Sequence, residues 1–211
     1  MNKKTLAIIG AGQLGEQIAH FAITDNHFSN IIFFDDYTSL NSLVGFKVHG
    51  KTNKIQDAYK NNEFDELFIG IGYKHMNERK KIFNIYKGLI PFANIVHSTA
   101  IIDDSIVMGE GNIIYPGCIL DAKVVLKDNI LINIGCAIAH DSKIGSHCFL
   151  SPRVALAGFV QIGEKSNLGI NTIVIDNLNL SANLQTGAGT VVIENLTVPG
   201  LYVGNPSRLI K

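Results

Sequence analysis

No charge of either sign prevails in this sequence of 211 residues. Its 18 lysines and arginines are balanced by 18 aspartates and glutamates. Without a net charge, the chain has no general electrostatic field that attracts nucleic acid or an anionic membrane surface. We therefore expect neither of these among its partners.

Cysteine is scarce, and disulfides are correspondingly not expected. The three cysteines, Cys118, Cys136 and Cys148, all lie in the second half of the chain. Their spacings, both multiples of six, favour buried free thiols in a reduced protein over a disulfide framework. Cys118 and Cys136 are nevertheless placed so that they could approach each other.

Long apolar runs are also missing. The longest have the length of short strands, so we expect no transmembrane span, and the N-terminus has no pattern of a signal peptide. The expectation is a soluble, cytoplasmic protein.

The second half of the chain has a strict period of six. A large apolar residue recurs at every sixth position, which matches neither the helical period of 3.6 nor simple strand alternation. It predicts a triangular β-helix with three six-residue sides and 18 residues per coil, in which these side chains stack inside and Gly, Asn, Asp and Ser fill the corners. This ladder consists of Ile102, Met108, Ile114, Leu120, Leu126, Ile132, Ile138, Ile144, Leu150, Leu156, Ile162, Leu168, Val174 and Leu180.

The first half alternates strand and helix patterns. Strands are predicted at 5–9, 30–34 and 66–72, with helical stretches following the first and third, which indicates a small parallel sheet of three or four strands. A short strand at 92–96 leads into the first coil. We therefore predict a Rossmann-like α/β domain over 1–94 and an all-β parallel β-helix over 95–211.

Gly10, Gly12 and Gly15 have the spacing of a nucleotide-binding turn between the first strand and its helix. Such a turn offers backbone N–H groups to a phosphate. Asp35, at the end of the second predicted strand, lies where dinucleotide folds place a ribose-binding acid. The small sheet favours a mononucleotide or a nucleotide sugar over a dinucleotide, and the alternative is that the glycines only pack helix against strand.

His140 and Asp141 are the candidate catalytic pair of the repeat. A histidine beside a carboxylate can act as a general base near neutral pH, although a surface histidine at a polar turn has the same sequence. Gly158 follows His140 by one predicted coil and takes the same corner of the next coil. Its amide is a candidate oxyanion donor, or the glycine serves the turn alone.

His147, the other histidine within the coils, is expected at the surface. A zinc site of the γ-carbonic-anhydrase type needs three histidines, and the ladder region has only two. We therefore predict no metal.

Together these motifs resemble the hexapeptide-repeat acyltransferases, which are left-handed β-helix enzymes. The whole chain looks like the bacterial nucleotide-sugar N-acetyltransferases that acetylate 4-amino-4,6-dideoxy sugars, and like the sialic acid O-acetyltransferase-like proteins that share their layout. The resemblance is carried by 10–15, 33–37, 68–72, 79–81, His140-Asp141 and 203–208.

The resemblance implies roles for individual residues. His140 would be the general base, Asp141 its polarising acid, Gly158 the donor to the thioester carbonyl and Asn133 a neighbour of the sugar. The nucleotide sugar would lie against Gly10, Gly12, Gln13, Leu14, Gly15, Asp35, Asp36, Gly70 and Gly72. Acetyl-CoA would lie against Phe149, Gly158, Gly187, Gly204, Pro206 and Arg208.

Two positions depart from the family pattern. Leu14 and Phe149 stand where relatives often have histidine. The contacts to the sugar and to acetyl-CoA at these two points must therefore differ.

The resemblance further implies direct transfer from acetyl-CoA in a ternary complex, within a homotrimer whose CoA sites lie between subunits, for the synthesis of surface glycans such as O-antigen lipopolysaccharide. Two alternatives are a sugar O-acetyltransferase and a non-catalytic trimeric scaffold. An NAD-dependent oxidoreductase is disfavoured, because the repeat offers no identifiable hydride-acceptor pocket.

Overall fold

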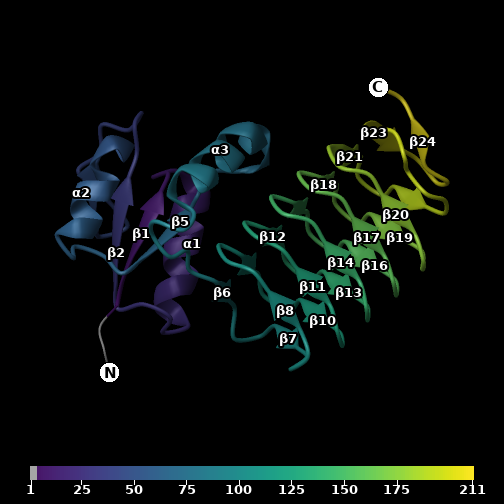
Figure 1. Cartoon of the computed structure of the whole chain (residues 1–211), viewed down its shortest axis with the longest axis horizontal. Coiled ribbons are helices and arrows are strands. Elements are labelled where there is room, and N and C mark those ends of the chain that lie inside the picture. Colours follow the sequence, from purple (N-terminus) through teal and green to yellow (C-terminus); the bar gives the residue numbers. More distant parts are fainter. Residues whose placement is uncertain (1–3) are drawn as a thin grey trace. The chain divides into compact units, whose positions relative to one another are not determined.

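The computed structural model describes residues 4–211 and contains two compact units (Figure 1). The first ends at Ile95 and the second comprises Val96–Lys211.

A five-stranded sheet forms the first unit, in the order β3-β4-β2-β1-β5. Its strands are parallel except that β3 runs antiparallel to β4. The prediction of three or four strands was too low, because the β3–β4 hairpin is short and only partly buried. The strands are β1 (Thr5–Ile9), β2 (Asn30–Phe34), β3 (Ser42–Leu43), β4 (Phe46–Gly50) and β5 (Glu66–Ile69), and the helices are α1 (Gln13–Thr24), α2 (Ile55–Lys60) and α3 (Met76–Tyr86).

Helices cover both faces of this sheet. Side chains that alternate along the strands, such as Ala7 and Phe34, form one buried cluster with residues of α2 and α3. Phe33 faces the other side, where a Cβ added to Gly15 of α1 would lie 3.5 Å from its ring. Among the described helices α1 is the longest, and its 12 residues fall short of the roughly 20 that a bilayer crossing needs.

The second unit is a parallel β-helix of two-residue strands stacked in three sheets (Figure 1). Neighbouring strands pair in register at an offset of one predicted coil, as in Leu120↔Ile138 and Leu126↔Ile144. The predicted coil length is therefore confirmed. The first sheet consists of β7 (Ile101–Ile102), β10 (Ile119–Leu120), β13 (Ala137–Ile138), β16 (Ala155–Leu156), β19 (Ile173–Val174) and β22 (Val191–Val192).

The other two sheets complete the triangular coils. The second consists of β8 (Val107–Met108), β11 (Val125–Leu126), β14 (Lys143–Ile144), β17 (Gln161–Ile162) and β20 (Asn179–Leu180). The third consists of β6 (Ile95–Val96), β9 (Ile113–Ile114), β12 (Leu131–Ile132), β15 (Phe149–Leu150), β18 (Asn167–Leu168), β21 (Leu184–Thr186), β23 (Gly200–Val203) and β24 (Arg208–Leu209).

The ladder predicted from the sequence is the core of this β-helix. From Ile114 to Leu180 each ladder side chain is at most 3% exposed, whereas Ile102 and Met108 in the first coil are only partly buried. A second inward position lies two places before each ladder residue and carries mostly small or β-branched side chains, with Asn112 and Leu178 as exceptions. It includes Cys118, Cys136 and Cys148, which are buried and free, as predicted.

Every corner from Gly111 to Gly189 turns through one residue in the left-handed region. These residues follow the ladder positions by three, with φ between +56° and +74°. Most are Gly, Asn or Asp, which tolerate this conformation best. Phe159, with φ +61°, is an apolar and bulky exception.

The last coil extends further than the period of six suggested. Thr186 and Val192 continue the inward ladder positions, and β22 still pairs with β19. The chain ends with β24, which runs antiparallel to β23.

We predict that Ile162→Ala, at a fully inward ladder position, lowers the free energy of unfolding by about 2–5 kcal/mol, because it leaves a cavity between the coils. Ile162 is 3% exposed, whereas its neighbour Gln161 points outward and is exposed. Gln161→Ala is therefore the matched control and should change stability by less than about 0.5 kcal/mol. Chemical denaturation measures both, and equal losses would contradict the stacked core.

Candidate active site

A cavity of about 750 Å³ opens at the carboxyl ends of β1, β2 and β5 in the first unit. It brings together eight of the nine residues predicted to contact the nucleotide sugar, and Gly15 is the one that does not line it. The lining contains Gly10, Gly12, Gln13, Leu14, Asp35, Asp36, Gly70 and Gly72, together with Tyr37, Thr52, His75 and Glu78, which the sequence analysis did not identify.

The glycines of this turn have two different roles. A Cβ on Gly15 would lie almost on the Gly10 carbonyl oxygen, and one on Gly70 would lie 3.0 Å from the Gly15 Cα atom. These two positions are required for close packing of α1 on the sheet. Gly12, by contrast, has open space where a Cβ would be, and it lies in the cavity wall. The packing interpretation therefore holds for Gly15, whereas Gly12 is left open to the cavity.

Asp35 joins the glycine turn to the loop after β2. Its carboxylate accepts hydrogen bonds from the backbone N–H groups of Ala11 (2.7 Å), Tyr37 (2.7 Å) and Thr38 (2.9 Å). Burial acts to raise the pKa of Asp35, but these three donors outweigh it and hold that pKa below its usual value. Asp35 thus stabilises the cavity wall as an ionised group.

Asp36 is hydrogen-bonded to Thr52, another residue that lines the cavity. It accepts hydrogen bonds from the Thr52 backbone N–H (2.9 Å) and from the Thr52 Oγ1 hydroxyl (2.8 Å). A carboxylate offers about four acceptor positions, so Asp36 retains capacity for a ligand donor. No sequence motif marks Thr52, since it reaches Asp36 only through the pairing of β2 with β4.

Arg79 holds the third wall of the cavity. Its guanidinium is 1% exposed and donates from Nη1 to the carbonyl oxygens of Ile69 and Ile71, both at 2.9 Å. A buried cation bound to backbone carbonyls constrains the end of β5 and the turn from Gly70 to Gly72.

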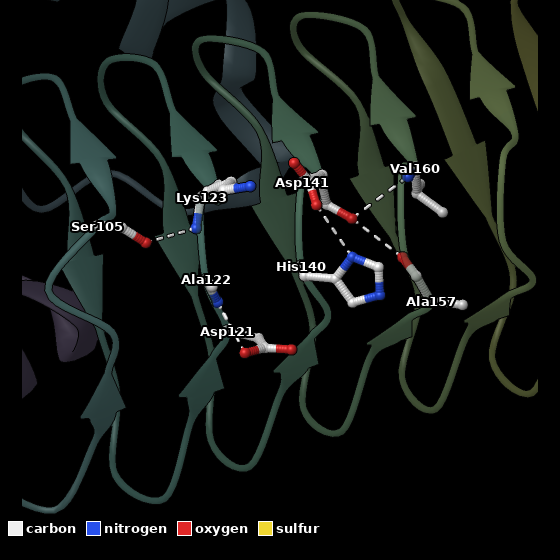
Figure 2. A network of polar contacts seen from close by, with 9 residues as sticks. Ser105, Asp121, Ala122, Lys123, His140, Asp141, Ala157 and Val160 are labelled. Carbon is white, nitrogen blue, oxygen red and sulfur yellow. Dashed lines mark hydrogen bonds and ion pairs between the residues drawn. The ribbon is translucent and has the colours of Figure 1, made fainter.

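A second constellation lies at one corner of the β-helix, where His140 and Asp141 form a hydrogen-bonded pair (Figure 2). The imidazole Nδ1 atom lies 3.0 Å from the Asp141 Oδ2 atom, and the two side chains are 49% and 31% exposed. Because a carboxylate accepts hydrogen bonds, Nδ1 of a neutral ring carries the proton in this contact. The Nε2 atom is then left with a lone pair, as a general base requires.

Gly158 lies directly beneath the imidazole. A Cβ added to it would be 2.7 Å from the His140 Cε1 atom and 2.9 Å from Nε2. The amides of Ala157 and Phe159 donate to the carbonyl oxygens of Val174 and His140, whereas within residues 4–211 the Gly158 amide has no such backbone acceptor. The step of one coil from His140 to Gly158 therefore places an imidazole and an unused N–H donor together.

Ser142 holds the two coils of this corner in register. Its hydroxyl donates to the Ala157 carbonyl oxygen (3.0 Å) and accepts from the Val160 N–H (3.2 Å). Figure 2 labels Ala157 and Val160, the residues at the far ends of these two bonds. Because Ala157 precedes Gly158, this buried hydroxyl fixes the position of Gly158 relative to His140.

Phe159 also contacts His140, and the sequence analysis did not identify it. The two rings meet edge to face, with centroids 5.2 Å apart and an interplanar angle of 88°. Such a contact contributes roughly 0.5–1.5 kcal/mol, while the left-handed backbone costs roughly 1–2 kcal/mol for a residue with a Cβ. The signal that could have found it is its position one coil after Asp141.

The remaining predicted contacts do not gather at this corner. Asn133 accepts a hydrogen bond from the Ile134 N–H (2.8 Å), and no hydrogen bond joins it to His140 among the described residues. Phe149 is 8% exposed on β15. The others lie in the last coil, where the Gly187 N–H donates to the Tyr202 carbonyl oxygen and Gly204, Pro206 and the exposed Arg208 surround the cis Asn205–Pro206 bond.

His147 is buried, so its predicted surface position was wrong. It is 4% exposed, and its Nδ1 atom lies 2.9 Å from the Asn129 Nδ2 atom one coil earlier. Stacking of equivalent corners gave the ring an amide partner, which the residue type alone does not reveal. In the described part of the chain, no group of three His, Cys, Asp or Glu side chains is arranged to hold a metal ion.

Cys136 and Cys148 are not poised as nucleophiles. The neighbouring Cys118 thiol and burial both raise the pKa of Cys136. Burial raises the pKa of Cys148 to about 12. Thiols with raised pKa values remain protonated and unreactive at neutral pH.

Comparisons with known proteins agree with this arrangement. Residues 5–86 match the model of the PglD N-terminal domain family. The acetyltransferase domain of PglB from Neisseria gonorrhoeae has a similar structure, with a TM-score of 0.90 and 26% identity over 99% of this chain and 100% of that domain. A search of curated proteins finds no significant match.

A second solved structure with this similarity is PerB from Caulobacter crescentus, in complex with CoA and GDP-perosamine. It has a TM-score of 0.90 and 26% identity over 98% of this chain and 97% of PerB. The chain shares its fold and the order of its two units with these acetyltransferases. Its β-helix is of the left-handed type found in this class. WeeI from Acinetobacter baumannii shares the fold, with a TM-score of 0.86 at 20% identity over 98% of this chain and 99% of WeeI.

We predict that Asp35 stabilises the fold in a pH-dependent way. Because its pKa is lower in the folded chain, its contribution is present above the unfolded-state value near pH 4 and is lost as the pH falls through the folded-state value. The difference in unfolding free energy between wild type and Asp35→Asn should therefore shrink as the pH falls below about 4. Asp104→Asn, at an exposed carboxylate of the second unit, is the control; a pH-independent Asp35 difference would refute the assignment.

Proposed function

We propose that this protein transfers an acetyl group from acetyl-CoA to the amino group of a nucleotide-linked 4-amino-4,6-dideoxy sugar, as a cytoplasmic step in bacterial surface glycan synthesis. The observation that carries the proposal is the corner at which the His140 ring is bound by Asp141 and lies over Gly158. Support also comes from PerB, solved with CoA and GDP-perosamine, and from the PglB acetyltransferase domain, solved with acetyl coenzyme A.

In the proposed reaction the sugar amine attacks the thioester carbonyl carbon. The His140 Nε2 atom takes the proton that the amine loses, and Asp141 stabilises the imidazolium through Nδ1. The Gly158 N–H donates to the carbonyl oxygen as its negative charge develops. Collapse of the tetrahedral intermediate breaks the carbon–sulfur bond, and CoA leaves as a thiolate that is protonated to the thiol.

The cavity of the first unit would bind the nucleotide part of the substrate. Gly12 offers an open backbone at the start of α1, where N–H groups favour a diphosphate. Asp36 and Tyr37, at its rim, offer an acceptor and an exposed aromatic ring to the nucleoside. We propose a pyrimidine nucleotide, UDP or dTDP, with GDP as the alternative.

We further propose that the active form is a homotrimer with acetyl-CoA bound between subunits. The outward side of the first β-helix sheet is apolar in a single chain, and it forms a shallow groove of about 820 Å³. Ile101, Ile119 and Ile173 on this side are 65%, 49% and 42% exposed. A sheet face of this composition is typical of an interface between subunits.

An O-acetyltransferase for sugars or sialic acid is the second candidate, because a hydroxyl acceptor uses the same base and oxyanion donor. A non-catalytic trimeric scaffold is the third, and it requires no turnover. The panel of acceptors described next separates all three.

We predict thiol release from acetyl-CoA in the presence of UDP-, dTDP- or GDP-linked 4-amino sugars, and a loss of about 10²–10⁴-fold in kcat in His140→Ala, because the general base is removed. His20→Ala, at an exposed histidine of α1, is the matched control and should retain activity. Turnover of free sialic acid alone would favour the O-acetyltransferase. Absence of turnover with every acceptor would favour the scaffold.

We predict that Gly158→Ala displaces the imidazole of His140 without destabilising the fold. The added methyl group would lie within 3 Å of the imidazole and displace it, while the φ of Gly158 is compatible with alanine. We expect kcat to fall by about 10²-fold or more with a melting temperature close to that of wild type. Ala157→Gly, one residue earlier, is the control for altered backbone at this corner. Full activity of Gly158→Ala would contradict a catalytic role for the imidazole in the position that it holds over Gly158.

A further inference from the structure

Phe159 is the apolar exception among the left-handed corner residues that run from Gly111 to Gly189. Its equivalents in neighbouring coils, Lys123, Asp141 and Asn177, share the left-handed φ but carry polar side chains. A phenylalanine here is strained, and its ring is 50% exposed. Neither folding nor solubility favours it at this position.

The aromatic ring of Phe159 lies against the imidazole of His140. Phe159 meets His140 edge to face, at a centroid distance of 5.2 Å. The backbone links the same two residues, because the Phe159 N–H donates to the His140 carbonyl oxygen (3.1 Å). The aromatic residue is therefore attached to the corner that carries the base.

His140 needs such a support. Its only side-chain hydrogen bond within residues 4–211 is to Asp141, and both side chains are substantially exposed to water, where one hydrogen bond holds a ring weakly. With Asp141 at Nδ1 alone, the ring can swing about this contact. Phe159 closes off one side and leaves the imidazole over Gly158.

We infer that Phe159 is a positioning residue for the acyl-transfer step, and that its ring keeps the His140 Nε2 atom beside the Gly158 amide. The inference rests on the proposed function of this corner. It requires no contact between Phe159 and the substrates. Its loss should therefore lower kcat while leaving KM for both substrates nearly unchanged.

The test is Phe159→Asn, which replaces the ring with a residue suited to the left-handed backbone. We expect a melting temperature equal to or above that of wild type, kcat reduced roughly tenfold or more, and KM values within about twofold. Phe159→Tyr, which keeps an aromatic edge, should restore most of kcat. Lys165→Asn, at another left-handed corner, is the matched control and should change neither parameter.

Two outcomes would overturn the inference. Unchanged kcat in Phe159→Asn would show that the ring does not position the base, and a change in KM for acetyl-CoA alone would show that it contacts the cofactor instead.

An activity-independent readout is the His140 Cε1–H resonance in ligand-free protein, which should shift when the aromatic ring current of Phe159 is removed. Absence of acetyl transfer in the wild type would refute the proposed function, while this resonance still tests the ring contact.

Discussion

Stacking of inward aliphatic side chains between successive coils is the interaction on which the second unit depends. Each coil has too few residues to form a core of its own, and its two-residue strands obtain their hydrogen bonds from the coils on either side. Burial of the ladder is therefore possible only if every coil keeps the same length. The residues at the corners, including His140, inherit their positions from this requirement rather than from local loop structure.

The ladder also explains how much of the molecule the sequence could predict. A strict period of six specifies the coil, and a step of one coil then pairs His140 with Gly158 without any structure. Asp141 follows from adjacency alone. In the first unit, the spacing of the glycines and of Asp35 was sufficient to predict one wall of the cavity, because motif and topology there involve consecutive elements.

Features that depend on contacts between side chains of different coils or strands were not predictable. His147 is buried because Asn129 of the preceding coil binds it, and Thr52 reaches Asp36 through the β2–β4 pairing. In the β3–β4 hairpin the apolar–polar alternation runs only from Phe46 to His49, no residue is fully buried, and β3 has just two residues, so the strand signal is weak. Phe159 looks like any exposed hydrophobic residue until its backbone conformation and its ring contact are known together.

His140 and Gly158 occupy the same corner of successive coils, so the β-sheet sets the spacing of their backbones. The backbones that carry His140 and Gly158 are separated by one strand spacing of about 4.8 Å, a value set by backbone hydrogen bonds and common to all such sheets. No loop can lengthen or shorten it. Side chains can therefore be exchanged along this column of equivalent corners while the spacing of the backbones that carry them stays constant.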